Sequence, residues 1–165
     1  MTAQASEPDP TVIDLETEAD ARAVAALVDT AFGPGRWAKT AERLREHNHP
    51  IPGLSLVARE AGRVTGSVRL WPVLIGDTPA AFLGPIAVED AQRRRGLGAQ
   101  LVERACEAAE AQGLAAVLLV GDEPYFGRFG FVRSNAKLPG PVDPRRVLIR
   151  MFGGGAPLEG KVRRP

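Results

Sequence analysis

Residues 81–120, AFLGPIAVEDAQRRRGLGAQLVERACEAAEAQGLAAVLLV, decide the fold of this chain. The stretch begins with an apolar run at 81–88, passes through a basic turn into an amphipathic segment at 96–112, and ends with an apolar run at 114–120. Two buried strands joined by a helix form a parallel pair through a right-handed crossover. Pro85 cannot donate a hydrogen bond to a neighbouring strand, so we expect a bulge or a local loss of pairing at Gly84-Pro85.

The flanking sequence predicts further helices and strands on both sides of this unit. Thr17, followed three residues later by Asp20, reads as a helix cap, and the apolar spacing after it predicts a helix that ends near Gly33. The remaining expected elements are a helix over 37–47, strands at 54–60 and 64–75 around a turn at 61–63, a turn at 76–79, a turn or short helix at 124–128, a strand from about 131, a loop at 138–144 and a strand at 147–152. Residues 1–11 are expected to be flexible and the tail from about 153 loosely ordered, which leaves a single domain over 12–165.

Composition restricts the class of protein. Hydrophobic residues are 44% and charged residues 25% of the sequence, close to the averages of soluble globular proteins. The formal net charge of +1 argues against a surface built to bind nucleic acid. We read neither a signal peptide nor a run of 18 apolar residues in the sequence, so we expect a cytoplasmic protein with no membrane segment.

Cysteine and histidine offer little chemistry in this sequence. Cys106 is the single cysteine, which excludes an intramolecular disulfide, and His47 and His49 complete only a poor set of zinc ligands, so no metal is expected. Cys106 falls in the middle of the predicted helix and is read as a structural residue rather than an acyl-carrying nucleophile. The two histidines are read as surface loop residues.

The basic turn has the composition of a phosphate-binding site. It comprises Arg93, Arg94, Arg95, Gly96, Leu97, Gly98 and Ala99. The first N–H groups of a helix lack intrahelical partners and lie at the positive end of the helix dipole, so glycines there let a pyrophosphate approach closely. An arginine run alone is more often a solvated turn. Its position between a buried strand and a helix, where three cations are unfavourable without a bound anion, favours a polyanion site.

Two other phosphate-binding motifs fit this turn poorly. A dinucleotide-binding G-x-G-x-x-G motif needs a third glycine, and Leu101 stands in its place. A Walker phosphate loop needs Gly-Lys-Ser/Thr, which the turn lacks.

The turn and the strand before it resemble the acetyl-CoA signature of the GNAT superfamily of N-acetyltransferases. That signature is R/Q-x-x-G-x-G/A, and this chain has Arg93-x-x-Gly96-x-Gly98 after the apolar residues 83–88. The motif gains specificity from its position, because it follows a buried strand and begins a helix.

A second segment resembles the YhbS-like branch of that superfamily. Residues 121–131, GDEPYFGRFGF, are similar to the G-D-x-x-Y-Y-x-R-F-G-F segment of that branch. Residues 138–141 and 158–162 also fit the branch, and the resemblance extends over nearly the whole chain from Val12.

The resemblance implies an α/β fold of the α+β kind, with a mixed sheet of six or seven strands flanked by helices. The sheet is expected to splay open beside the strand at 81–88, and coenzyme A enters that wedge. On this basis the main chain of Ile86, Ala87 and Val88 pairs with the pantetheine arm, while the amides of residues 93–99 hold the pyrophosphate. Phe126 is assigned to the same cofactor site.

Tyr125 is the candidate general acid for the leaving thiolate. Many GNAT enzymes have a tyrosine four residues before the glycine of the closing Gly-Phe pair, and here that position is Phe126. Tyr125 is adjacent, but successive side chains in a helical turn point about 100° apart. No general base is identified: Glu89, Asp90 and Asp122 lie only near strand ends, and water-mediated deprotonation of the acceptor stays open.

The sequence therefore predicts acetyl transfer from acetyl-CoA to a primary amine by direct attack in a ternary complex. The acceptor is a small molecule, an antibiotic-like amine, or a protein N-terminus or lysine, and the enzyme is a monomer or a homodimer. One alternative is a coenzyme A-binding sensor or interaction module without turnover. Another is a toxin-like enzyme that acetylates aminoacyl-tRNA, which the near-neutral charge disfavours although Arg145 and Arg146 would help.

Overall fold

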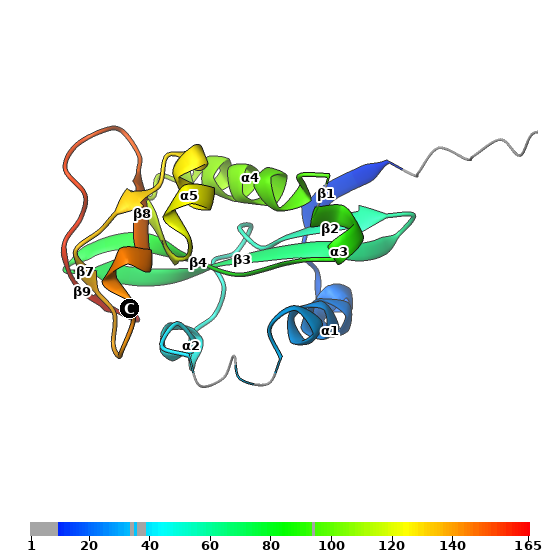
Figure 1. The fold of residues 1–165 in the computed structure, drawn as a ribbon, viewed down its shortest axis with the longest axis horizontal. Coiled ribbons are helices and arrows are strands. Elements are labelled where there is room, and N and C mark those ends of the chain that lie inside the picture. Colours follow the sequence, from blue (N-terminus) through cyan, green and yellow to red (C-terminus); the bar gives the residue numbers. More distant parts are fainter. Residues whose placement is uncertain (1–9, 34, 36–38, 94) are drawn as a thin grey trace, which may run out of the picture.

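Helices cover both faces of one central sheet (Figure 1). The structure is a computed structural model, and it describes residues 10–33, 35, 39–93 and 95–165. Its strands are β1 (Thr11–Leu15), β2 (Leu56–Glu60), β3 (Arg63–Ile75), β4 (Thr78–Val88), β5 (Ala116–Val120), β6 (Val132–Arg133), β7 (Ala136–Lys137), β8 (Val147–Met151) and β9 (Gly160–Arg163). Its helices are α1 (Ala21–Phe32), α2 (Glu42–Arg45), α3 (Asp90–Arg93), α4 (Leu97–Ala111) and α5 (Glu123–Phe126), with 3-10 turns at Glu18–Asp20, Gly127–Phe129 and Pro144–Arg146. Figure 1 shows α4 and α5 on one face of the sheet, and α1 and α2 on the other.

The sheet is mixed and mostly antiparallel. Its strands run in the order β1-β2-β3-β4-β5-β8-β6, and β9 pairs with both β3 and β7. β4 and β5 are parallel, with Ala81 opposite Val117 and Phe82 opposite Leu118, so the predicted parallel pair with α4 as its crossover is confirmed. The described residues form nine strands rather than six or seven, because β1 and the short β6, β7 and β9 extend the sheet.

Pairing between β3 and β4 shifts at Gly84-Pro85, where the sequence predicts it. Val68 lies opposite Ile86, but Leu70 lies opposite Leu83, so β4 contains an extra residue between the two pairs. The Gly84-Pro85 peptide bond is cis. The bulge lies beside the point where β4 and β5 separate, and bulges redirect a strand at such places.

The predicted hairpin between β2 and β3 is confirmed. β2 ends at Glu60 and β3 begins at Arg63. Ala61 and Gly62 have φ values of 51° and 78°. Two consecutive left-handed residues are typical of a type I′ turn, whose twist matches that of the strands it joins.

The sequence periodicity explains which helix faces are buried. The buried residues of α4 are Leu97, Leu101, Val102, Ala105, Cys106 and Ala109. They recur every three or four residues, which is the spacing of one helix face. On the opposite face of the sheet, Val24 and Val28 of α1 pack against Val57 and Ala87. Truncation of a fully buried side chain such as Leu101 to alanine therefore costs about 2–5 kcal/mol of unfolding free energy.

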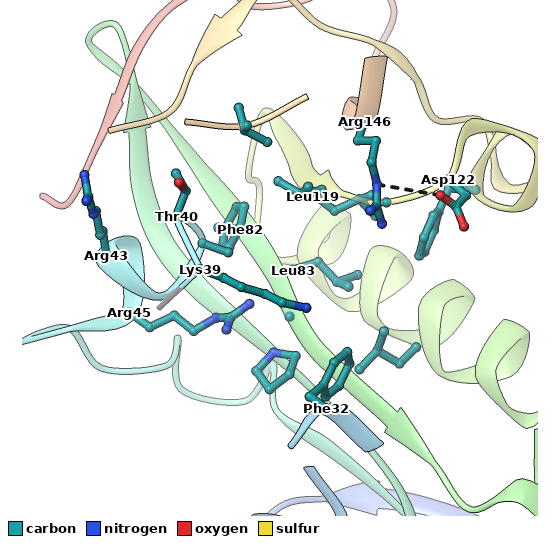
Figure 2. A pocket seen from close by; sticks show the side chains of 18 of the residues that line it. Phe32, Lys39, Thr40, Arg43, Arg45, Phe82, Leu83, Leu119, Asp122 and Arg146 are labelled. Carbon is teal, nitrogen blue, oxygen red and sulfur yellow. Dashed lines mark ion pairs between the residues drawn. The ribbon is translucent and has the colours of Figure 1, made fainter. Parts of the chain in front are cut away.

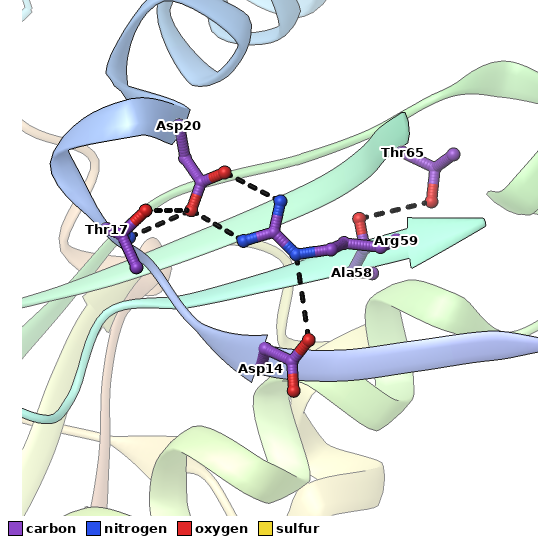
Figure 3. Close-up of polar contacts among 6 residues, drawn as sticks. All are labelled: Asp14, Thr17, Asp20, Ala58, Arg59 and Thr65. Atoms are coloured by element: carbon purple, nitrogen blue, oxygen red, sulfur yellow. Dashed lines mark hydrogen bonds and ion pairs between the residues drawn. The ribbon is translucent and has the colours of Figure 1, made fainter. Parts of the chain in front are cut away.

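An ion-pair cluster fastens the start of α1 to β2 (Figure 3). Asp20 accepts hydrogen bonds from Arg59 Nη1 at 2.6 Å and Arg59 Nη2 at 2.7 Å, and from the Thr17 backbone N–H at 2.8 Å. Asp14 lies 3.6 Å from Arg59 Nε. The hydrogen bonds from Arg59 hold the pKa of Asp20 well below the usual range of an aspartate.

Three segments differ from the expectation. The second helix is the short α2, Glu42–Arg45, whereas the sequence predicted 37–47; Trp37 lies outside the described residues. The tail expected to be loosely ordered contains β9, and a strand not predicted, β1, begins at Thr11. Residues 1–9 of the expected flexible segment lie outside the described residues. Across the described part of the chain, no helix is both long and apolar enough to cross a membrane.

Candidate functional site

The sheet opens where β4 and β5 separate. The two strands are paired only at two positions, which end at Phe82 and Leu118. Beyond them lies a space of about 620 Å³, here called the wedge cavity, which β4 residues 83–86 and residues 119–122 line on two sides. Phe32, residues 39–41, Arg43 and Arg45 close it on the α1 and α2 side, and Phe82, Phe126 and residues 141, 142 and 146 complete the lining (Figure 2). The splayed sheet that the sequence predicted beside residues 81–88 is therefore present.

A second space, here called the turn cavity, lies at the start of α4. It has a volume of about 540 Å³. Its lining residues are Ala31, Phe32, Ile86, Val88, Arg93, Gly96, Gly98, Ala99, Tyr125 and Arg128. Phe32 and Ile86 line both cavities, so the two spaces adjoin at the edge of β4.

Two glycines keep the first turn of α4 open. Gly96 precedes the helix with φ of 75°, a left-handed conformation that other residues rarely adopt. A Cβ at Gly98 would lie 3.0 Å from the hydroxyl oxygen of Tyr125 and would narrow the turn cavity. The first amides of α4 have no intrahelical partners and lie at the positive end of the dipole. The turn therefore has the shape and polarity that a pyrophosphate needs.

Arginines on two sides make the turn cavity basic. Arg93 lines it, is 56% exposed, and donates from Nε to the Val88 carbonyl oxygen at 3.3 Å. Arg128 also lines it, with its guanidinium 4.7 Å from the centre of the Tyr125 ring. Arg95 is exposed and does not line the cavity, and Arg94 lies outside the described residues. Of the two predicted arginines that the structure describes, Arg93 lines the cavity and Arg95 does not.

Tyr125 and Phe126 belong to different cavities. Their rings are nearly perpendicular, at 87°, with centres 4.8 Å apart. Tyr125 lines the turn cavity, whereas Phe126 lines the wedge cavity and packs so closely on Gly121 that a Cβ there would overlap its ring. The predicted divergence of these two neighbouring side chains is therefore present in the structure.

Predicted main-chain contacts are compatible with the burial of two further residues. The side chains of Ala87 and Leu97 are each 2% exposed and belong to the core. Both residues were assigned to coenzyme A through their backbone groups, and a buried side chain does not prevent these groups from contacting a ligand. Ile86, Val88 and Ala99 line the turn cavity directly.

One of the three candidate carboxylates lines the wedge cavity. Asp122 lies there, with its carboxylate 3.6 Å from Arg146 Nε. Glu89 instead pairs with Arg63, and Asp90 is exposed at the start of α3. Asp122 is therefore the carboxylate of this set that a substrate in the wedge cavity can reach.

Cys106 and the two histidines lie away from both cavities. Cys106 is fully buried in α4, and burial raises the pKa of its thiol to about 11. Such a thiol is protonated at neutral pH and is a poor nucleophile. His47 and His49 are exposed in the segment after α2. Among the described residues, no group of three or more His, Cys, Asp or Glu side chains is arranged to hold a metal ion.

Sequence reasoning did not place five basic residues in the site. Lys39, Arg43, Arg45 and Arg146 line the wedge cavity, and Arg128 lines the turn cavity. Arg128 lies within the quoted motif at 121–131, three residues after Tyr125, and that spacing on a helical turn was the available signal. Lys39 and Arg45 reach the sheet only through the fold of the chain between α1 and β2, and no local pattern predicts that.

Comparisons with known proteins agree with this geometry. The chain matches the model of the acetyltransferase (GNAT) family over residues 21–131. It is 33% identical to the N-acetyltransferase YhbS of Escherichia coli over 122 residues, which cover 73% of this chain and 72% of YhbS.

Two solved structures have a similar fold. The crystal structure of YhbS from Escherichia coli in complex with CoA has a TM-score of 0.76 and 27% identity, over 96% of this chain and 93% of that chain. A GNAT family acetyltransferase from Brucella melitensis in complex with acetyl-CoA has a TM-score of 0.72 and 26% identity, over 94% and 96%. The family match, the identity to YhbS and the sheet opened between β4 and β5 lead to one conclusion: the chain belongs to the acetyltransferase (GNAT) family.

Proposed function

We propose that this chain transfers the acetyl group of acetyl-CoA to a primary amine by direct attack within a ternary complex. The observation that carries the proposal is the junction of the two cavities at Ile86 and Phe32. A single ligand can have its phosphates at the start of α4 and its reactive end between β4 and β5. The relatives crystallised with CoA and with acetyl-CoA support acetyl-CoA as that ligand.

The turn cavity is proposed to bind the pyrophosphate. The amides of Leu97, Gly98 and Ala99 donate to its oxygens, since they belong to the unpaired first turn of α4. Arg93 and Arg128 add positive charge on two sides. Arg94 and Arg95 stay in the proposed site as further sources of charge around the turn.

The edge of β4 is proposed to bind the pantetheine arm. β4 has no ladder partner in β5 beyond Phe82, so the backbone groups of residues 86–88 on that side have no strand partner, and the amides of the arm share the Val88 carbonyl oxygen with Arg93 Nε. Backbone N–H and C=O groups that lose a strand partner gain by pairing with a ligand. Phe126, packed on Gly121, forms an apolar wall where the arm ends.

The proposed reaction takes place in the wedge cavity. The amine nitrogen attacks the thioester carbonyl carbon, a C–N bond forms, and the C–S bond breaks. The amine loses one proton, for which Asp122 is the proposed acceptor, directly or through water. The coenzyme A thiolate gains one proton. Water is the proposed main donor, and Tyr125 is the candidate donor among the side chains. Positioning of the two reactants supplies most of the rate enhancement.

The experiment for this proposal measures thiol release from acetyl-CoA with a panel of amines, and identifies the acetylated product by mass spectrometry. Release that depends on both acetyl-CoA and an amine, with a product 42 Da heavier than the amine, is the expected result, the increment being the mass of one acetyl group that replaces one hydrogen. Tight acetyl-CoA binding without transfer to any amine of the panel would instead favour a coenzyme A sensor.

A further inference from the structure

The wedge cavity has more positive than negative charge. The basic residues in its lining are Lys39, Arg43, Arg45 and Arg146, and the acidic residue is Asp122. Figure 2 shows the side chains of Lys39 and Arg45 reaching across one side of the cavity, with Asp122 and Arg146 on the other side. The floor between them is apolar and includes Leu83 and Leu119.

Two of these four cations have acidic partners. Arg45 Nη1 lies 3.1 Å from Glu42, and Arg146 Nε lies 3.6 Å from Asp122. Lys39 has its ammonium 5.6 Å from the centre of the Phe32 ring, and within the described part of the chain no ion pair is found for it. The positive charge of Lys39 is therefore not compensated by Glu42 or Asp122.

Arg43 adds further charge at the same side. Its Nη1 donates to the Pro139 carbonyl oxygen at 2.7 Å, which fixes the guanidinium against the loop at 138–144 but leaves its charge in place. The neighbouring Thr40 hydroxyl donates to the Pro141 carbonyl oxygen. These two contacts fasten the basic side of the cavity to the loop, so the cations occupy defined positions.

We infer that the acceptor is a small amine that carries an anionic group, a carboxylate or a phosphate, which binds beside Lys39 and Arg45. The amine end then points across the apolar floor to Leu119 and Asp122, where β4 and β5 separate. The inference rests on the proposed function and names the substrate class of the same site. A cavity of about 620 Å³ has room for a small acceptor together with the end of the pantetheine arm.

The net positive charge of the lining also disfavours acceptors that carry several positive charges. A polyamine or an aminoglycoside carries several ammonium groups into this cavity and is repelled. The lining thus selects an acceptor whose net charge is neutral or negative.

The test compares acceptors that differ only in the anionic group. One pair is an α-amino acid and its carboxamide, and the other is phosphoethanolamine and ethanolamine. We expect kcat/KM to be ~10-fold or more higher for the charged member of at least one pair, since hydrogen bonds to charged groups are strong. The pair with the larger ratio identifies carboxylate or phosphate as the anion.

Variants connect that preference to Lys39. Lys39→Met should lower the charged-to-neutral ratio of kcat/KM by ~5-fold, the upper range for an exposed ion pair, and Lys39→Arg should restore most of it. Lys137→Met is the matched control, because Lys137 is exposed on β7 and lines neither cavity; the ratio should not change.

Failure of this inference is distinct from failure of the proposed function. Acetyl-CoA binding followed by equal or faster transfer to the uncharged members, or to polyamines, contradicts the inference alone. So does transfer to other amines but to neither member of either pair. If Lys39→Met and wild type have the same charged-to-neutral ratio of kcat/KM, Lys39 does not bind the anionic group, and the inference is contradicted. Absence of acetyl-CoA binding contradicts the proposed function itself.

Discussion

The hydroxyl of Tyr125 lies against Gly98, so close that a Cβ on Gly98 would stand 3.0 Å from it. This contact directs the hydroxyl to the turn cavity, while Phe126 faces the wedge cavity. We therefore expect Tyr125→Phe to lower single-turnover rates by less than the ~100-fold typical for loss of a dedicated general acid. The measurement is made at saturating acetyl-CoA. A larger fall with unchanged acetyl-CoA affinity would mean that Tyr125 protonates the thiolate after all.

Phe126→Tyr is the complementary variant. It restores a hydroxyl at the position where many GNAT enzymes have their tyrosine, inside the wedge cavity. The variant should fold and keep at least the wild-type single-turnover rate, because the ring stays packed on Gly121. A severe loss of rate in a folded Phe126→Tyr protein would show that the space beside Gly121 has no room for the added oxygen.

Arg93 and Arg95 form a matched pair for the electrostatic contribution to cofactor binding. Both are exposed cations beside the same turn, but only Arg93 lines the turn cavity. Affinity for coenzyme A should fall with rising salt. The slope of affinity against salt concentration should become shallower in Arg93→Ala than in Arg95→Ala. Titration calorimetry between about 50 and 500 mM salt gives both slopes, at concentrations that span the change in Debye length. Identical slopes in wild type and both variants would leave the main-chain amides as the sole anchor.

Cys106→Ser should retain acetyltransferase activity per folded molecule. The thiol is buried in α4, its raised pKa of about 11 keeps it protonated at neutral pH, and the proposed transfer is direct. The new hydroxyl in the core is expected to cost about 1–3 kcal/mol of unfolding free energy, so activity is compared at a temperature where both proteins are folded. Recovery of an acetyl group on Cys106 that is later transferred to product would overturn the direct mechanism.

Asp20→Asn should destabilise the fold without changing the site. It removes the negative charge and replaces one of the two acceptor oxygens with an NH2 group that cannot accept from Arg59, so a loss of about 2 kcal/mol of unfolding free energy is expected for this charged pair. Asp77→Asn is the control, since Asp77 is fully exposed and its pairing with Arg163 should contribute little. Denaturant unfolding at neutral pH measures both, and equal stability of the two variants would contradict the role of Asp20.

The pH dependence of stability provides a second readout for Asp20. Its pKa is lowered in the folded protein, so its contribution is fully present above the ordinary aspartate value of about 3.9 and is lost as pH falls below it. Asp20→Asn should therefore lose less stability than wild type between about pH 4 and pH 2. If the unfolding free energies of the two proteins fell equally over this pH range, Asp20 would be excluded as a source of the acid sensitivity.

Local signals predicted the elements at the centre of the fold. Pro85 lacks an N–H, which was enough to predict the irregularity at Gly84-Pro85, and the glycines at 96 and 98 marked the start of α4. β1 was missed because Val12 and Leu15 are exposed and give no burial pattern; its pairing with β2 makes it a strand. β9 likewise depends on pairing with β3 and β7, which lie far away in the sequence.

The candidate site was predictable to the extent that it uses the main chain. Gly96, Gly98 and Val88 line the turn cavity as the motif implied, because one strand and one helix start form that part. Lys39 and Arg45 were not predicted, since the segment between α1 and β2 has to cross the opened sheet before they reach the wedge cavity. Charge in a cavity formed by distant segments is a property of tertiary structure.

Binding of acetyl-CoA to the Gly96→Glu variant tests the central claim most directly. Apart from its chain neighbours, no atom of the described residues lies within 4 Å of the position of a Cβ at Gly96, so a Cβ there meets open space, although the φ of 75° strains any other residue. Gly96→Gln shares the strain and the bulk and lacks the charge, which makes it the matched control. By titration calorimetry, with circular dichroism to confirm that both variants are folded, we expect weakened acetyl-CoA binding in Gly96→Gln and no detectable binding in Gly96→Glu, because a carboxylate is then present where the pyrophosphate binds. Wild-type acetyl-CoA affinity in a folded Gly96→Glu protein would contradict the assignment of the cofactor site.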